Sequence, residues 1–401
     1  MKNACLFLTL VLALLPVGDS ARAQQQKPLV LRGGLLIDGT GKAPLRDSVV
    51  VIVDGKIQSV GAEGSVSLPA DATVINTAGK TIIPGLADSH VHFRNFLAPL
   101  FLYWGVTTVG DMANVPGWIF AEKRAVETGR SIGPYIMTVG HMINGRRRNP
   151  QDIPGPGELA GVRTFLNGNS YQTYVSDEAA IEAAIAESKR LGADAVKLYR
   201  RMDPALMRAA ARIGHQQGFP VFAHFTSADP RLGLFLGTDE ILDTGIDTHV
   251  HVFGLIKAAV PPEIRDRIAR GEEVEAWHLL DTSKFPALAQ AMVDQKMFLN
   301  PTLGSEFVLF SRHREEFDRL QTAFLQGPMG AVLPEASRSP YLAMYKPYRG
   351  EHGEEMTEGY RRVGAFVKEF VQRGGKVIAG TDSGPGAQAA GLNLHVEMRL
   401  L

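Results

Sequence analysis

The chain has 401 residues, and its 42 basic and 42 acidic side chains give a formal net charge of +0 at pH 7. Such a balance supplies no basic surface for nucleic acids or anionic membranes, so we expect neither as a partner. The only cysteine is Cys5, at the start of the chain, so the remainder offers no thiol nucleophile, no thiolate ligand and no disulfide. Any metal site must therefore use nitrogen and oxygen ligands.

Residues 1–23 have the pattern of a secretory signal peptide. Lys2 is followed by an almost unbroken apolar run, Cys5–Val17, and the small residues of Ala21–Ala23 precede a cleavage point before Gln24. The run is too short for a comfortable membrane span. We predict cleavage after Ala23, export to the periplasm or the medium, and no membrane segment in the mature chain. An uncleaved membrane anchor is the alternative.

Residues 24–84 predict a small β domain. The segments LVLRGGLLIDG, SVVVIVDGKIQSVG and ATVINTAGKTIIPG combine β-branched runs with Gly-Gly, Asp-Gly and Gly-Lys turn signals, which favours an antiparallel, β-sandwich-like unit. The GTGK stretch, Gly39–Lys42, is not a phosphate loop. Leu36 stands where the first glycine belongs, and Ala43 stands where Ser or Thr is needed.

From residue 85 onward, short apolar strands alternate with helix-length spacers, which predicts a (β/α)8 TIM barrel. The expected strands are GLADSHVH (85–92), GVTTVGDM (105–112), PYIMTVGH (134–141), ADAVKLY (193–199), FPVFAHF (219–225), IDTHVHVF (246–253), KMFLNPT (296–302) and KVIAGTDSG (376–384). Residues 144–161 and the charged stretch 311–360 are expected to be loops over the active face. The chain ends 19 residues after Asp382, which predicts a barrel over 85–401 with an incomplete last helix.

Polar residues recur where these strands end, and the carboxyl ends of barrel strands meet at one face. They are His90 and His92 on the first strand, Lys197 on the fourth, His224 on the fifth, His251 on the sixth and Asp382 on the eighth. Residues two apart on a strand share a face, so the first two can both point into the barrel mouth. The set predicts a metal site of nitrogen and oxygen ligands.

The motifs GLADSHVHF, GVTTVGDM, GADAVKLY, FPVFAHF, GIDTHVHVF and AGTDSG resemble those of the metal-dependent amidohydrolase superfamily, in its imidazolonepropionase-like and Xaa-Pro dipeptidase-like branch. The resemblance implies two divalent metal ions, which we expect to be zinc. His90 and His92 would bind the more buried ion, and His224 and His251 would bind the other. Lys197, carboxylated by CO2, would bridge the two ions. His249 is the rival of His251, and we expect it one layer deeper on the same face.

In this resemblance Asp382 is both a ligand and the general base that takes a proton from the attacking water. His141 would contact the substrate carbonyl. Deaminases of the superfamily usually carry a glutamate where this chain has Ser227, which favours hydrolysis. The basic run Arg146–Arg148 is expected to be a solvated loop, with a contact to a substrate carboxylate as the alternative.

The expected function is metal-dependent hydrolysis of an amide or peptide C–N bond in a small substrate, a dipeptide or an N-acyl amino acid. A cyclic-amide hydrolase of the imidazolonepropionase type remains open. So does a non-catalytic or degenerate exported binding protein, because the short C-terminal part indicates either a fragment or a degenerate member. The sequence carries no signal for an oligomeric state.

Overall fold

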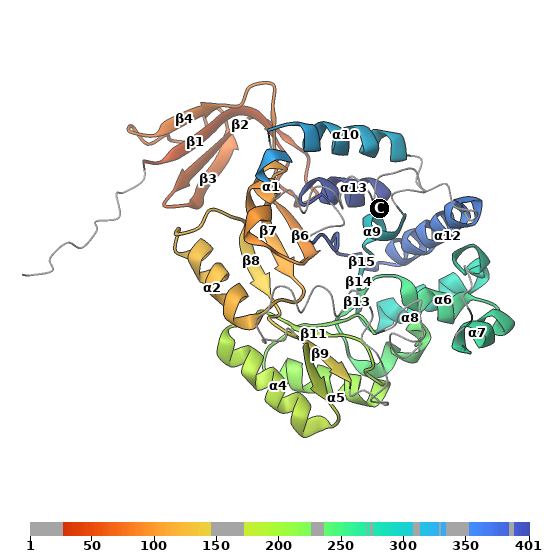
Figure 1. Cartoon of the computed structure of the whole chain (residues 1–401). Helices are drawn as coiled ribbons and strands as arrows, with labels where there is room; N and C mark the ends of the chain where they lie inside the picture. Colours follow the sequence, from red (N-terminus) through yellow and green to blue (C-terminus); the bar gives the residue numbers. More distant parts are fainter. Residues whose placement is uncertain are drawn as a thin grey trace, which may run out of the picture. The chain divides into compact units, whose positions relative to one another are not determined.

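The computed structural model describes residues 27–145, 172–225, 236–270, 272, 276–307, 313–328, 330–333, 353–384 and 389–401. The expected signal peptide, Arg146–Arg148 and Ser227 lie outside these residues. The chain divides between Pro84 and Gly85 into two compact units, Met1–Pro84 and Gly85–Leu401, here called unit 1 and unit 2 (Figure 1).

Unit 1 holds one five-stranded sheet in the order β3-β2-β1-β4, with β5 also paired to β1. Its strands are β1 (Leu29–Leu36), β2 (Leu45–Val53), β3 (Lys56–Ala62), β4 (Thr73–Asn76) and β5 (Thr81–Ile82). The pairs β1–β2 and β2–β3 are antiparallel, as predicted, but β4 and β5 run parallel to β1. The turn at Asp54 and Gly55, both at positive φ, joins β2 to β3 tightly, whereas the longer connection to β4 allows a parallel return.

In the described part of unit 2 the strands form two sheets, and every strand pair in them is parallel. The three-stranded sheet has the order β6 (Leu86–Val91), β7 (Val106–Asp111), β8 (Tyr135–Thr138). The seven-stranded sheet has the order β10 (Gln172–Val175), β9 (Met142–Gly145), β11 (Val196–Leu198), β12 (Val221–Ala223), β13 (Thr248–Val250), β14 (Phe298–Asn300), β15 (Lys376–Val377). The parallel α/β architecture expected from the sequence is therefore present.

Helices follow most of these strands, and Figure 1 shows them arranged around the strands of unit 2. They are α1 (Ala98–Tyr103), α2 (Pro116–Glu127), α4 (Glu178–Leu191), α5 (Pro204–Gln216), α6 (Phe253–Ala259), α7 (Pro262–Ala269), α8 (Phe285–Asp294), α9 (Leu303–Phe307), α10 (Arg314–Gln326), α12 (Gly353–Gln372) and α13 (Leu392–Leu400). Short 3-10 turns are η1 (Asn95–Leu97), η3 (Thr238–Glu240), η4 (Leu242–Thr244), η5 (Trp277–Leu279), η6 (Thr282–Lys284) and η8 (Gly330–Val332). None of the described helices is long and apolar enough to span a bilayer.

The main apolar core of unit 2 lies between the sheet and its helices. Leu198 of β11 belongs to it, together with Ile181 and Ile185 of α4. Successive residues of a strand face opposite sides, so the neighbouring side chain of Lys197 points away from these helices. A second, smaller apolar cluster on the opposite side includes Phe222 and Ala195. The strand alternation thus places Lys197 on the face that carries the polar strand ends.

The prediction that 311–360 is a loop was wrong for the helix α10 and for the start of α12. Phe317, Phe324 and Leu325 are buried in α10, whereas Glu315 and Arg319 of the same helix are exposed. An amphipathic helix whose exposed face is highly charged resembles a polar loop in composition, although its apolar residues keep the helical period.

Candidate metal centre

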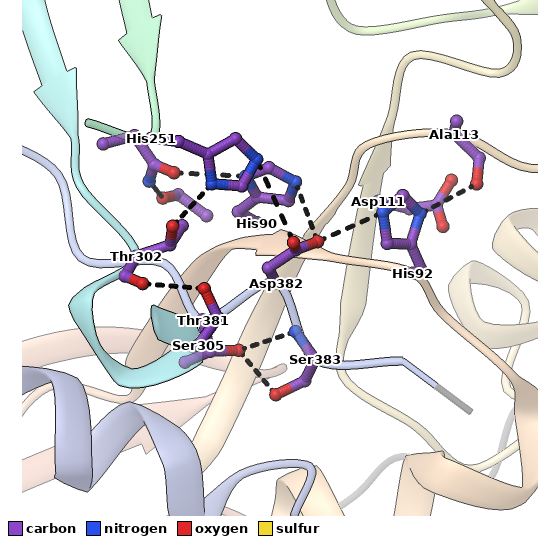
Figure 2. Close-up of polar contacts among 12 residues, drawn as sticks. His90, His92, Asp111, Ala113, His251, Thr302, Ser305, Thr381, Asp382 and Ser383 are labelled. Carbon is purple, nitrogen blue, oxygen red and sulfur yellow. Dashed lines mark hydrogen bonds and ion pairs between the residues drawn. The ribbon is translucent and has the colours of Figure 1, made fainter. Parts of the chain in front are cut away.

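Three histidine side chains of unit 2 converge on the carboxylate of Asp382 (Figure 2). The Nε2 atoms of His90 and His92 lie 3.3 and 3.2 Å from Asp382 Oδ1, and His251 Nε2 lies 3.9 Å from Oδ2. Ligand atoms of His90, His251 and Asp382 all lie within 4.8 Å of one another, close enough to hold a metal ion together. His90 lies at the end of β6, His92 directly follows that strand, and His251 directly follows β13, as the strand pattern predicted. The expected eighth strand is shorter than predicted, because β15 ends at Val377, and Asp382 lies in the segment that follows it.

The other ring nitrogen of each histidine is held by a different group. His90 Nδ1 lies 3.2 Å from Asn300 Oδ1, and His251 Nδ1 lies 2.6 Å from Thr302 Oγ1. His92 Nδ1 lies 3.4 Å from the backbone oxygen of Ala113. Metal-binding histidines are usually oriented in this way, with one nitrogen hydrogen-bonded and the other directed at the ion. The arrangement fits a divalent ion with nitrogen and oxygen ligands.

His224 extends this cluster. Its ring centroid lies 4.6 Å from that of His251 and 4.6 Å from that of Tyr199. The His224 Nε2 atom is buried and forms no hydrogen bond. A buried ring nitrogen without a partner is rare, and a metal ion would satisfy it. His224 is therefore available as a ligand beside His251.

Lys197 is 2% exposed, and its charge affects the pKa values of the histidines in this cluster. Burial is the main cause that lowers the pKa of His90, His224 and His251, and the charge of Lys197 adds to it. At His92 burial also acts to lower the pKa, but the hydrogen bond and the charge of Asp382 outweigh it and raise the pKa. The Asp382 carboxylate in turn favours the charged form of Lys197. The structure thus brings five of the six predicted metal ligands together through contacts between their side chains. The place of Lys197 among the ligands stays a prediction.

Burial decides the protonation of most of these groups. It lowers the pKa of His90 and His224 well below the ordinary value and that of His251 to about 3, so these rings are neutral. Burial works in the opposite sense on Asp382, but the surrounding histidines outweigh it and hold the pKa of that carboxyl well below its usual range. Neutral imidazoles and an ionised carboxylate are the forms that bind metal ions.

The backbone is strained at two of these residues. His251 and Asp382 have φ values of 63° and 56°, in the left-handed region that residues other than glycine rarely adopt. The Asp382 N–H donates to the His90 carbonyl at 2.7 Å, and the His251 N–H donates to the Asn300 carbonyl at 2.8 Å. Strain of this kind is typical of functional sites, where surrounding contacts hold it. Here it turns both side chains toward the common centre.

Two other predicted positions differ from this picture. The sequence predicted that His249 shares a face with His251, but the structure places the two rings on different partners. The His249 Nε2 atom lies 2.9 Å from Thr238 Oγ1, and its ring packs against Phe225. The left-handed turn at His251 ends the strand alternation, which explains why the prediction of a shared face was wrong.

His141 is buried and its Nε2 has no hydrogen bond, but no contact among the described residues joins it to the six predicted ligands. Its substrate role stays a prediction.

Sequence reasoning missed the residues that support the ligands. Asn300 and Thr302 lie at the end of the seventh expected strand, and both are fully buried. Asp88 accepts hydrogen bonds from Thr381 N and Oγ1, at 3.1 and 2.7 Å, and so fixes the residue before Asp382. The signal was present, because the rule that selected polar residues at strand ends applies equally to Asn300.

No family model matches the chain. Enamidase from Eubacterium barkeri is 39% identical to it over 67 residues, which are 16% of this chain and 17% of the enamidase. The match therefore spans less than a fifth of that relative.

Solved structures resemble the chain over most of its length. Bottromycin amidohydrolase has a TM-score of 0.62 and 19% identity, covering 97% of this chain and 77% of its own. A Xaa-Pro dipeptidase with bound methionine in its active site has a TM-score of 0.58 and 17% identity, covering 93% of this chain and 84% of its own. The chain thus shares the mixed α/β fold of these two structures, and it resembles proteins named as an amidohydrolase and a Xaa-Pro dipeptidase, in line with the motifs of its sequence.

Proposed function

We propose that the chain is a metal-dependent hydrolase that cleaves an amide or peptide C–N bond in a small substrate, a dipeptide or an N-acyl amino acid. The observation that carries the proposal is the convergence of three Nε2 atoms on the Asp382 carboxylate, with every Nδ1 held by another group. The similarity to a Xaa-Pro dipeptidase and an amidohydrolase supports the same bond type.

In this proposal two divalent ions are held by His90, His92, Lys197, His224, His251 and Asp382. Zinc suits this set of nitrogen and oxygen donors best. Such ions polarise the carbonyl under attack and make a water acidic enough to attack it near neutral pH. The remaining requirements of the reaction fall on the protein, which has to admit the substrate and move one proton.

Asp382 is suited to move that proton. Its side chain is 29% exposed and that of His92 is 33% exposed, whereas that of His90 is 2% exposed, so the substrate approaches from the side of Asp382 and His92. Asp382 takes a proton from the attacking water and gives it to the leaving nitrogen as the C–N bond breaks. The products are a carboxylic acid and an amine.

The bridging role of Lys197 requires the free amine, the form that reacts with CO2 to give a carbamate. Burial lowers the pKa of Lys197 to about 7, so a large share of the side chain is uncharged near neutral pH. Protein prepared with ¹³C-bicarbonate and metal should show a carbamate carbonyl resonance, and Lys197→Met should remove it. Identical spectra for the two proteins would contradict carboxylation of Lys197.

The proposed activity is tested by measuring metal content and by screening dipeptides, N-acyl amino acids and cyclic amides. We expect close to two ions per chain and hydrolysis of an acyclic substrate. Asp382→Asn should lower turnover by about 10²- to 10⁴-fold, the usual contribution of a general base. Asp281→Asn, at an exposed 3-10 turn, is the matched control and should leave turnover unchanged.

Three outcomes would contradict this assignment. Unchanged turnover in Asp382→Asn excludes the proposed base. Hydrolysis of cyclic amides alone favours the imidazolonepropionase-type reaction. Bound metal without hydrolysis of any amide in the screen favours a non-catalytic exported binding protein.

We further propose that the two sheets of unit 2 join into one closed (β/α)8 barrel. Two backbone hydrogen bonds support the closure: Ser89 N–H to the Ala379 carbonyl at 3.1 Å, and Asp194 N–H to the Thr138 carbonyl at 2.8 Å. Export through residues 1–23 belongs to the same proposal. N-terminal sequencing of the protein recovered outside the cytoplasm should begin at Gln24.

A further inference from the structure

Glu397, in helix α13, is a buried acid outside the proposed ligand set. Its side chain is fully buried. Its Oε1 accepts a hydrogen bond from Leu303 N–H at 3.0 Å, and its Oε2 accepts one from Gly304 N–H at 2.6 Å. In the described part of the chain no basic group contributes to the shift of its pKa. Buried acids are rare unless they are paired, so the hydrogen bonds from these two backbone N–H groups are the contacts that offset the cost of burying Glu397.

The two donors come directly after Thr302, which contacts a proposed ligand. Thr302 Oγ1 lies 2.6 Å from His251 Nδ1, and Figure 2 shows the two side chains facing each other. Ser305 closes the turn, because its N–H and its Oγ both bond to the Thr302 carbonyl, at 3.1 and 2.8 Å. Glu397 therefore holds the chain immediately after the residue that orients His251.

The backbone conformation of Thr302 has to be stabilised by its surroundings. Its φ is 50°, in the left-handed region that β-branched residues strongly avoid. A relaxed backbone at this position would move Oγ1 away from His251. The N–H groups that follow Thr302 are buried, so without Glu397 they would lack a partner and the turn would shift to find one.

We propose that Glu397 is a positioning residue for the metal site. Its side chain fixes the left-handed turn at Thr302, which in turn holds His251 with Nε2 directed at Asp382. The inference rests on the proposed metal role of His251. It assigns to helix α13 a function in the site that its position in the sequence does not suggest.

The experiment compares three variants of the full chain. Glu397→Met removes both acceptors at similar volume, and Glu397→Gln keeps one oxygen. Leu400→Ala is the control, because it removes a buried apolar side chain from the same helix. All proteins are loaded with Co²⁺, and its affinity is measured by competition with a chelator at a temperature where circular dichroism shows them folded.

We expect Glu397→Met to weaken Co²⁺ binding about tenfold, the lower end of the effect of residues that support metal ligands. Glu397→Gln should recover part of the loss, and Leu400→Ala should bind Co²⁺ within about twofold of the wild type while melting at a lower temperature. The ligand-field spectrum of Co²⁺ should change in Glu397→Met alone. A wild-type affinity and spectrum in Glu397→Met would overturn the proposal.

A metal-free measurement separates this inference from the proposed function. In ¹⁵N-histidine-labelled protein without metal, we expect one fixed tautomer for His251 in the wild type and in Leu400→Ala. Glu397→Met should give a mixture of tautomers. If the wild type binds no Co²⁺, the metal role fails, yet the tautomer still tests the turn. An unchanged His251 spectrum in Glu397→Met would refute the positioning role by itself.

Discussion

Asn300 should contribute more to the site than any other residue outside the ligand set, and Asn300→Ala tests this. The side chain is fully buried at the end of β14. Its Oδ1 lies 3.2 Å from His90 Nδ1, and its Nδ2 donates to Ser89 Oγ at 2.7 Å and to the Ile378 carbonyl at 3.0 Å. The amide therefore connects two strands, β6 and β14, with the segment that follows β15.

The expected decrease in the free energy of unfolding follows from the hydrogen bond that each partner of Asn300 loses. Each buried hydrogen bond contributes about 1 kcal/mol, so three bonds give about 3 kcal/mol. Ser89 Oγ keeps its own bond to the Ala379 carbonyl at 2.7 Å, so its loss is the smallest. His90 Nδ1 and the Ile378 carbonyl remain buried without this partner. We expect Asn300→Ala to lower the free energy of unfolding by about 3 kcal/mol and to weaken metal binding about 10- to 100-fold.

Tryptophan fluorescence in urea is the appropriate assay, because Trp104, Trp118 and Trp277 all belong to unit 2. Metal affinity is measured on the folded variant by chelator competition. Ser283→Ala, which removes an exposed hydroxyl, is the control and should change stability by less than about 0.5 kcal/mol. A loss below about 1 kcal/mol in Asn300→Ala, with wild-type metal affinity, would refute the reasoning.

Two further predictions concern the same region. Thr302→Val removes the oxygen that contacts His251 Nδ1 and should weaken metal binding about tenfold or more, whereas Thr302→Ser should retain most of the affinity; equal affinities measured by chelator competition would contradict this. Burial, helped by the charge of Asp88, raises the pKa of Glu397 from 4.5 to about 8, so the folded chain keeps a proton that the unfolded chain releases. The resulting stabilisation is full below about pH 4.5 and is lost as the pH rises through about 8. Urea titrations between pH 5 and 8 should show a smaller decline in Glu397→Gln than in the wild type.

Local chemistry made helix α4 predictable. The Asp177 side chain caps its start by accepting a hydrogen bond from Ala180 N–H, and Gly192 ends it at a φ of 92°. Ile181 and Ile185 are four residues apart and face the core together. Every signal lies within the segment DEAAIEAAIAESKRLG, so this helix-length spacer can be recognised as a helix from the sequence. The parallel strands of unit 2 were recognisable for a similar reason, since buried β-branched runs alternate with such helices.

Features that depend on distant partners were not predictable in this way. The direction of β4 is set by its pairing with β1, about 40 residues earlier in the sequence, and nothing in TVIN distinguishes a parallel from an antiparallel neighbour. His249 and His251 look equivalent in THVH. Only the backbone turn at His251, held by the Asn300 carbonyl, separates the ring that joins Asp382 from the ring that packs on Phe225.

The same distinction explains why ligands were found and their supports were not. Few side chains can bind a metal through nitrogen or oxygen, so His and Asp at strand ends stand out in a sequence. The groups that hold the histidines need only offer a hydrogen-bond partner at the right place. Here an amide, a hydroxyl and a backbone carbonyl serve in turn, from Asn300, Thr302 and Ala113. The third group is a backbone carbonyl, which any residue type would supply, so it cannot be recognised in the sequence. Substitutions at Asn300 and Thr302 can therefore show how much the groups that support the histidines contribute.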